Sequence, residues 1–113
     1  MVTIYHNPRC SKSRETLALL NARGIEPEVV LYLQTPLDRE TLQILLQKLG
    51  MQSAQQLMRT KEAIYSELAL SDKSESALLD ALVEHPVLIE RPIVINGDKA
   101  RIGRPPEAVL DLF

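Results

Sequence analysis

The strongest constraint on the fold is the pattern of residues 2–32, where two apolar runs flank an amphipathic helix. The run Val2–Tyr5 predicts a short strand, and Asn7-Pro8 after it is typical of a loop. The following helix is expected to end at Gly24, a residue type favoured just past helix ends. Three apolar residues are expected on one side of this helix: Leu17, Ala18 and Leu20.

The second apolar run, residues 28–32, is bounded by Pro27 and by Gln34-Thr35-Pro36. A near-continuous apolar run of this length favours a strand buried on both faces of a parallel sheet. Strand, helix and strand in this order form a βαβ unit, which has a right-handed crossover by default.

The middle of the chain has helical periodicity. Thr35-Pro36-Leu37-Asp38 is expected to start a helix, with Thr35 as N-cap, proline at the first helical position and an acid at the third. Gly50 is expected to end it. Ser53 and Gln56 form a capping-box pattern for a short second helix. Two further helices are expected: one around Tyr65, and one that begins near Ser71 to Ser74 and ends before Pro86. The apolar positions of the first and last of these helices are Leu42, Leu45, Leu46, Leu49, Leu78, Leu79, Leu82 and Val83.

The last third returns to strand. Two apolar segments, 93–95 and 99–102, flank Asn96-Gly97-Asp98, which is a strong hairpin signal. Pro105 and Pro106 suit the first turn of a closing helix that carries Val109, Leu110 and Leu112. The expected order is therefore β-α-β, four helices and β-β-α. We interpret residues 1–113 as one α/β domain with a helical insertion at about 36–86.

Cys10, the only cysteine, lies where the first loop meets the first helix. Backbone N–H groups and the positive end of the helix dipole favour a thiolate at such a position. Arg9, Lys12 and Arg14 add positive charge, and His6 lies four residues upstream. A lone cysteine is often an inert buried hydrophobe, but a strand-to-helix corner is less easily buried than the interior of an element. We therefore interpret Cys10 as a reactive thiol.

Three arginines, Arg59, Arg91 and Arg104, fall at the edges of expected elements rather than inside them. Guanidinium groups that converge at one end of a sheet could clamp an oxyanion. Taken singly, each is more often a solvated surface residue, and spacing alone does not bring them to Cys10. Pro92 precedes a strand, where proline is common, and the sequence by itself favours a trans bond there.

Composition excludes several classes of protein. The net charge of -2 gives no basic field for bulk nucleic-acid binding. We expect no signal peptide, because the first residues have neither a basic region nor a long apolar run. We expect no membrane-spanning segment, because no apolar run is long enough. We expect no metal site, because the His, Cys and acidic residues lack the spacing of metal ligands. A single cysteine cannot form an internal disulfide and fits a cytoplasmic protein. Any redox cycle must take its second thiol from another molecule.

The segment Ile4-Tyr5-His6-Asn7-Pro8-Arg9-Cys10-Ser11-Lys12-Ser13 resembles the active-site opening of the glutaredoxin-linked arsenate reductases, the ArsC family of thioredoxin-like proteins. The resemblance continues in order through nearly the whole chain. Its further segments are Leu31–Pro36, Leu57-Met58-Arg59, His85-Pro86, Arg91–Ile95 and Arg101–Pro105.

The resemblance implies a thioredoxin-like (glutaredoxin-like) fold with a mixed four-stranded sheet. It implies that Cys10 is the nucleophile and that His6 and Ser13 help to lower its pKa. Arg59, Arg91 and Arg104 would hold the arsenic oxyanion, and Pro92 would be a cis-proline facing the thiol. Arsenate would be reduced to arsenite with glutathione as co-substrate and glutaredoxin as protein partner, without a bound cofactor.

Three other functions stay open, of which a purely structural role is the least favoured, because nothing structural requires the cysteine loop. A glutathione-dependent thiol-disulfide reductase would use the same cysteine, although a disulfide does not need three cationic clamps. A regulatory module of the same fold would bind another protein, although a single cysteine in a C-x-x-S pattern gives no two-cysteine switch.

Overall fold

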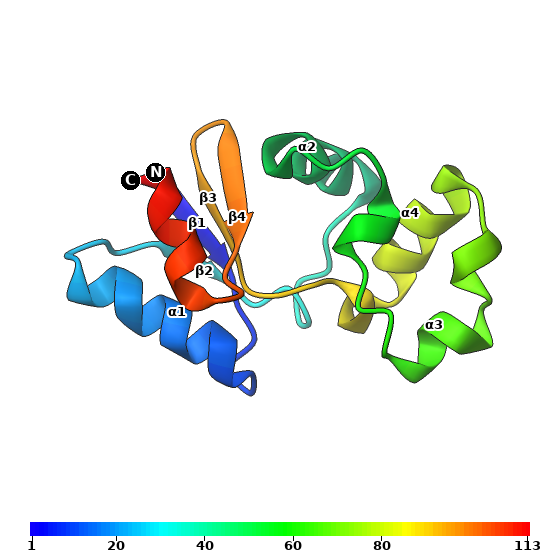
Figure 1. Cartoon of the computed structure of the whole chain (residues 1–113), viewed down its shortest axis with the longest axis horizontal. Helices are drawn as coiled ribbons and strands as arrows, with labels where there is room; N and C mark the ends of the chain where they lie inside the picture. Colours follow the sequence, from blue (N-terminus) through cyan, green and yellow to red (C-terminus); the bar gives the residue numbers. More distant parts are fainter. The chain divides into compact units, whose positions relative to one another are not determined.

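The computed structural model describes every residue, Met1–Phe113, and the chain divides into two compact units. The first, here called the sheet unit, consists of Met1–Thr35 and Arg91–Phe113. The second, the helical unit, is the continuous segment Pro36–Glu90. Figure 1 shows the strands in the first unit and most of the helices in the second.

The sheet unit contains a four-stranded mixed sheet with the order β2-β1-β3-β4. Strand β1 (Val2–Tyr5) pairs in parallel with β2 (Glu28–Val30) and antiparallel with β3 (Ile93–Asn96). A hairpin turn at Gly97 joins β3 to the antiparallel β4 (Lys99–Ile102). The predicted βαβ unit, hairpin and mixed sheet are therefore confirmed.

One face of this sheet carries the core of the unit. Ile4 of β1 and Val94 of β3 are register partners, so their side chains share a face. Both are fully buried together with Leu20 of helix α1 (Ser11–Ala22) and Val109 of η4 (Pro106–Leu112). Helix α1 and η4 also contact each other beside the sheet (Figure 1). The core thus fixes the start of α1 relative to the ends of β1 and β3.

Three predictions for the sheet unit were wrong in detail. The run 28–32 is not buried on both faces, because β2 is an outer strand of only three residues and Val29 is 44% exposed. The inner face of α1 carries hydroxyl side chains, Ser13 and Thr16, whereas Ala18 is exposed. The closing helix is a 3-10 helix that begins at Pro106, with Pro105 as its N-cap.

The helical unit has three α-helices: α2 (Arg39–Leu49), α3 (Ala63–Glu67) and α4 (Glu75–Glu84). Short 3-10 turns lie between and after them: η1 (Ala54–Leu57), η2 (Leu70–Asp72) and η3 (Pro86–Leu88). The buried leucines of α2 and α4 include Leu42, Leu45, Leu46, Leu78, Leu79 and Leu82, as the periodicity predicted.

The helix ends in this unit follow ordinary capping chemistry, with one correction. Helix α2 does not begin after Thr35, because Asp38 is its N-cap and its carboxylate accepts a hydrogen bond of 2.8 Å from the Thr41 N–H. Gly50 ends α2 with a φ of 72°, a conformation that glycine adopts without a steric penalty. The capping box of Ser53 and Gln56 is confirmed.

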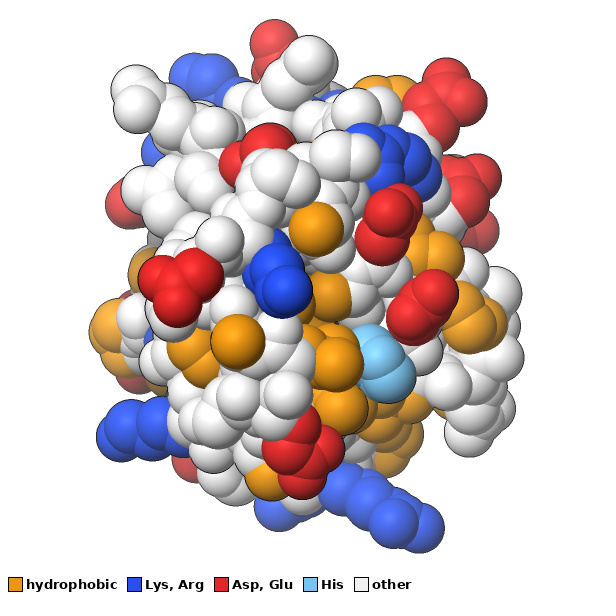
Figure 2. Space-filling model, turned by 90° about the vertical axis from the view of Figure 1, so that its right-hand side faces the viewer, with side chains coloured by type: hydrophobic (Ala, Val, Ile, Leu, Met, Phe, Trp, Pro, Cys, Tyr) orange, Lys and Arg blue, Asp and Glu red, His pale blue; other side chains and the backbone are white.

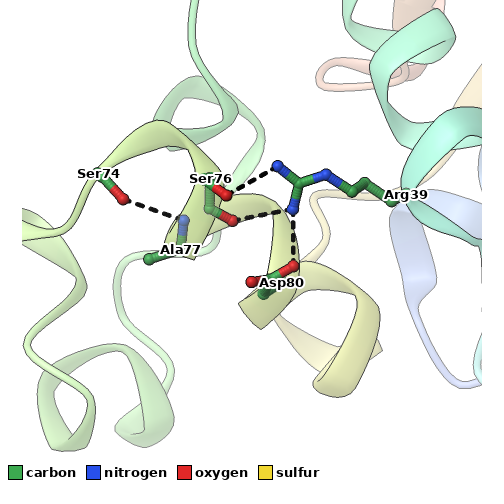
Figure 3. A network of polar contacts seen from close by, with 5 residues as sticks. All are labelled: Arg39, Ser74, Ser76, Ala77 and Asp80. Atoms are coloured by element: carbon green, nitrogen blue, oxygen red, sulfur yellow. Dashed lines mark hydrogen bonds and ion pairs between the residues drawn. The ribbon is translucent and has the colours of Figure 1, made fainter.

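A polar network joins α2 to α4 (Figure 3). Arg39 Nη1 donates to Asp80 Oδ1 at 2.6 Å and to the Ser76 carbonyl at 3.1 Å, while Nη2 donates to Ser76 Oγ at 2.9 Å. The side chains of Arg39 and Asp80 are 39% and 65% exposed, so solvent screens the charge pair. The network therefore orients the two helices more than it stabilises them.

We expect Arg39→Ala to lower the free energy of unfolding by about 1 kcal/mol, because exposed ion pairs and their hydrogen bonds contribute little. Leu42→Ala, at a fully buried position of the same helix, is expected to cost about 2–5 kcal/mol. Urea unfolding measures both variants. A loss for Arg39→Ala as large as that for Leu42→Ala would contradict the screening argument.

Figure 2 shows acidic and basic side chains scattered among apolar ones. No helix is both long and apolar enough to cross a membrane. No group of three or more His, Cys, Asp or Glu residues is arranged to hold a metal ion.

Candidate active site

Cys10 is the N-cap residue of α1, with φ -96° and ψ 122°, and it closes the loop that follows β1. Its N–H donates to the Asn7 carbonyl at 3.0 Å. The Asn7 side chain accepts a hydrogen bond of 3.0 Å from the Arg9 N–H, so the loop has the local bonding that asparagine favours in turns. Arg14 of α1 reaches back and donates to the Pro8 carbonyl at 2.9 Å. The backbone around the thiol is thus held from both sides.

The surroundings of Cys10 favour its thiolate. Burial by itself raises the pKa of the Cys10 thiol, since only 8% of the residue is exposed. The Ser13 N–H, the Arg91 charge, the Lys12 N–H and the Arg104 charge act in the opposite direction and together lower this pKa below its ordinary value. The first turn of a helix supplies two of these four groups, as the sequence predicted.

Arg104 contacts the thiol directly. Its Nη2 donates to Cys10 Sγ at 3.7 Å, and its Nε donates to the Arg91 carbonyl at 2.9 Å. Arg91 precedes β3 and Arg104 follows β4, so the β3–β4 hairpin brings both to one end of the sheet. Two of the three predicted arginines therefore act on Cys10.

His6 and Ser13 are brought together beside the loop. His6 Nδ1 and Ser13 Oγ share a hydrogen bond of 2.6 Å, and Ser13 Oγ also accepts one of 3.0 Å from the Asn7 N–H. Burial, and to a smaller extent the Arg14 charge, lower the pKa of His6. A neutral imidazole is therefore favoured. The hydroxyl of Ser13 faces His6, whereas its backbone N–H faces Cys10.

Pro92 lies between Arg91 and β3 in a cis peptide bond, as the family resemblance implied and contrary to the preference of the sequence alone. Its carbonyl accepts a hydrogen bond of 2.9 Å from the Gly103 N–H. The bond between Arg104 and Pro105 is also cis, which the sequence did not indicate.

Arg59 belongs to the helical unit. Its N–H donates to the Leu88 carbonyl at 2.7 Å, and its guanidinium lies 3.5 Å from the Glu62 carboxylate. An antiparallel bridge between Met58 and Ile89 holds the neighbouring backbone. A role for Arg59 in binding an anion at Cys10 stays a prediction.

A cavity of about 270 Å³ adjoins the cysteine loop within the sheet unit. Loop residues 6–9 form one wall, and Leu31, Leu33 and Gln34 form the other. Its lining combines apolar side chains with amides and one cation, Arg9. Sequence reasoning missed this cavity because it depends on the turn after β2, where a longer strand was expected.

The site predicts different effects for two substitutions on the reactivity of Cys10. Ser13→Ala keeps the backbone N–H that faces the sulfur, whereas Arg104→Gln removes a charge that lowers the Cys10 pKa. We therefore expect Arg104→Gln to raise this pKa more than Ser13→Ala does. The pH dependence of iodoacetamide alkylation measures it. If Ser13→Ala raised the Cys10 pKa as much as Arg104→Gln or more, the hydroxyl of Ser13, rather than its N–H, would be the group that acts on the sulfur.

His6 makes a second pH prediction. A folded-state pKa below the unfolded value of 6.5 means that the unfolded chain binds more protons as the pH falls through this range. The stability that neutral His6 contributes is complete above 6.5 and is lost as the pH falls toward the lowered pKa. Wild type should therefore lose more stability than His6→Asn between about pH 7.5 and about pH 5 in urea unfolding. Parallel losses would contradict the assignment.

Known proteins are similar to this chain over nearly its whole length. A sequence model described as the ArsC family matches residues 5–112. The "Uncharacterized protein YfgD" of Escherichia coli strain K12 is 64% identical, over 98% of this chain and 95% of its own length. The "Arsenate reductase" of Haemophilus influenzae is 57% identical, over 99% of this chain and 98% of its own length.

A solved structure, "Arsenate reductase from Vibrio cholerae", superposes with a TM-score of 0.97 at 54% identity. It covers 99% of this chain, which in turn covers 97% of that protein. The expected thioredoxin-like α/β fold is thereby confirmed.

Proposed function

This chain belongs to the ArsC family, and from that premise we propose that it reduces arsenate to arsenite, with Cys10 as the nucleophile and with glutathione and glutaredoxin as reductants. The observation that carries the proposal is the contact between Arg104 Nη2 and Cys10 Sγ at 3.7 Å. This contact joins a thiol whose surroundings favour the thiolate to a cation that can attract an oxyanion to the sulfur. Relatives that bear the name arsenate reductase support the choice of substrate.

In the first step the Cys10 thiolate attacks arsenic, the As–S bond forms, and one arsenate oxygen leaves as water after protonation. Arg91 and Arg104 neutralise the anion and stabilise the charge on its oxygens as the bond forms. Arg59 is proposed as the third cation. The buried neutral His6 orients Ser13, whose N–H faces the sulfur.

The later steps need thiols from outside the chain, because Cys10 is its only cysteine. Glutathione attacks the arsenic of the adduct, and a second oxygen leaves as water. A glutaredoxin thiolate then attacks the glutathione sulfur and forms a mixed disulfide. The electron pair of the broken As–S bond stays on arsenic, which becomes As(III), and hydrolysis of the Cys10–As bond releases arsenite.

Arsenate-dependent oxidation of NADPH, coupled through glutathione, glutaredoxin and glutathione reductase, tests the proposal. We expect turnover by wild type and none by Cys10→Ser, because an alcohol at this position is not ionised near neutral pH. Activity of Cys10→Ser above background would exclude Cys10 as the nucleophile. A folded wild type without activity, but with activity on a glutathione mixed disulfide, would favour the thiol-disulfide reductase.

Arg104→Gln is expected to lower kcat/KM for arsenate by about 10- to 100-fold, which corresponds to the loss of one hydrogen bond to a charged group. Arg23→Gln is the matched control, because it removes the same charge at the opposite end of α1. Equal losses in the two variants would mean that net charge, rather than the contact with Cys10, determines activity.

A further inference from the structure

We propose that Gly103 is a positioning residue that sets the Arg104 guanidinium against Cys10. Gly103 immediately follows β4 and precedes Arg104. Because it has no side chain, the end of β4 can lie against both α1 and Pro92. The inference rests on the proposed role of Cys10 as a nucleophile, and it concerns how the fold maintains that role.

The requirement for glycine at position 103 is steric. A Cβ atom there would lie 2.5 Å from Thr16 Oγ1, 2.8 Å from Pro92 Cγ and 3.2 Å from Thr16 Cγ2. The chain's three other glycines have positive φ angles and open space around them, so their role is conformational. Gly103 alone is required by its neighbours.

Neither neighbour is free to move aside. Thr16 is fully buried, and its hydroxyl donates to the Lys12 carbonyl at 2.8 Å, which holds its rotamer. Pro92 is also buried, and its ring has few conformations. A methyl group at position 103 would therefore displace the backbone after β4 from α1 or from Pro92.

This displacement would also move Arg104, the next residue, which contacts the Cys10 thiol. The Gly103 N–H donates to the Pro92 carbonyl, and Arg104 Nε donates to the Arg91 carbonyl, both at 2.9 Å. Two consecutive residues after β4 are thus paired with two consecutive residues before β3. The contact from Arg104 Nη2 to Cys10 Sγ is long, at 3.7 Å, so a shift of a few tenths of an ångström would weaken it.

Thr16 provides a second structural connection between Gly103 and Cys10, through helix α1. It lies on the helix that begins after Cys10, and its hydroxyl bonds to the carbonyl of Lys12 in the first turn. The Lys12 N–H is one of the groups that lower the pKa of Cys10. Gly103 therefore contacts both the helix that carries the thiol and the proline beside the cations.

A double-mutant cycle tests the proposal, with the pH profile of iodoacetamide alkylation at Cys10 as the measurement. We expect Gly103→Ala to slow alkylation at neutral pH by roughly threefold or more, because a smaller fraction of the thiol is ionised. Arg104→Gln should slow it in the same direction, and the double variant should be no slower than Arg104→Gln alone. An unchanged profile for Gly103→Ala, or effects that add in full, would overturn the proposal.

Leu42→Ala separates positioning from general destabilisation. Leu42 is fully buried in the helical unit and lies outside the core that holds α1, so its truncation should lower the midpoint of thermal unfolding. The alkylation profile of this variant should match that of wild type. If its alkylation profile shifted as much as that of Gly103→Ala, any loss of stability would be enough to change the reactivity of Cys10. That result would overturn the proposal.

Adding Thr16→Ala to Gly103→Ala removes two of the three atoms that the new methyl group meets. The profile of this variant should return part of the way to wild type. Failure of both Gly103→Ala and this rescue variant to fold would also overturn the proposal, because Gly103 would then be required by the fold as a whole. Alkylation needs no arsenate, so these results are independent of whether arsenate is the substrate.

Discussion

The site depends on the way in which the first turn of α1 meets the sulfur of Cys10. Buried sulfur would favour the neutral thiol, and the backbone N–H groups of Ser13 and Lys12 reverse that preference together with Arg91 and Arg104. The core leucine, Leu20, holds α1 against β1 and β3, so the geometry of these N–H groups follows from the packing of the sheet unit. Reactivity is in this sense a property of the fold rather than of the cysteine alone.

The local part of the site could be predicted from the sequence. Cys10 lies where the loop after a short apolar strand meets an amphipathic helix, and this pattern predicts how the segment folds. The roles of His6 and Ser13 were implied only by the family resemblance. The order of elements was also predictable, because hydrophobic periodicity and the Gly97 turn are local signals. Where the periodicity is ambiguous, prediction failed: the apolar run after Pro27 forms a short outer strand followed by a turn.

The long-range part could not be predicted from residue spacing. Arg91 and Arg104 reach Cys10 only because β3 pairs with β1 and the hairpin returns the chain to the same end of the sheet. The expectation that these arginines lie near Cys10 came from the family resemblance, because residue spacing and strand order alone do not imply it. Gly103 had no signal at all, since its requirement arises from the side chains of Thr16 and Pro92, which are distant in sequence.

The separation of Cys10 from Arg104, 94 residues along the chain, has a consequence for protein synthesis. Cys10 is therefore synthesised before β3, which completes the pairing of β1, and before both Arg91 and Arg104. Until then the thiol lacks the two cations that help to lower its pKa. The action of Arg91 and Arg104 on the nucleophile therefore waits until the β3–β4 hairpin has joined the sheet.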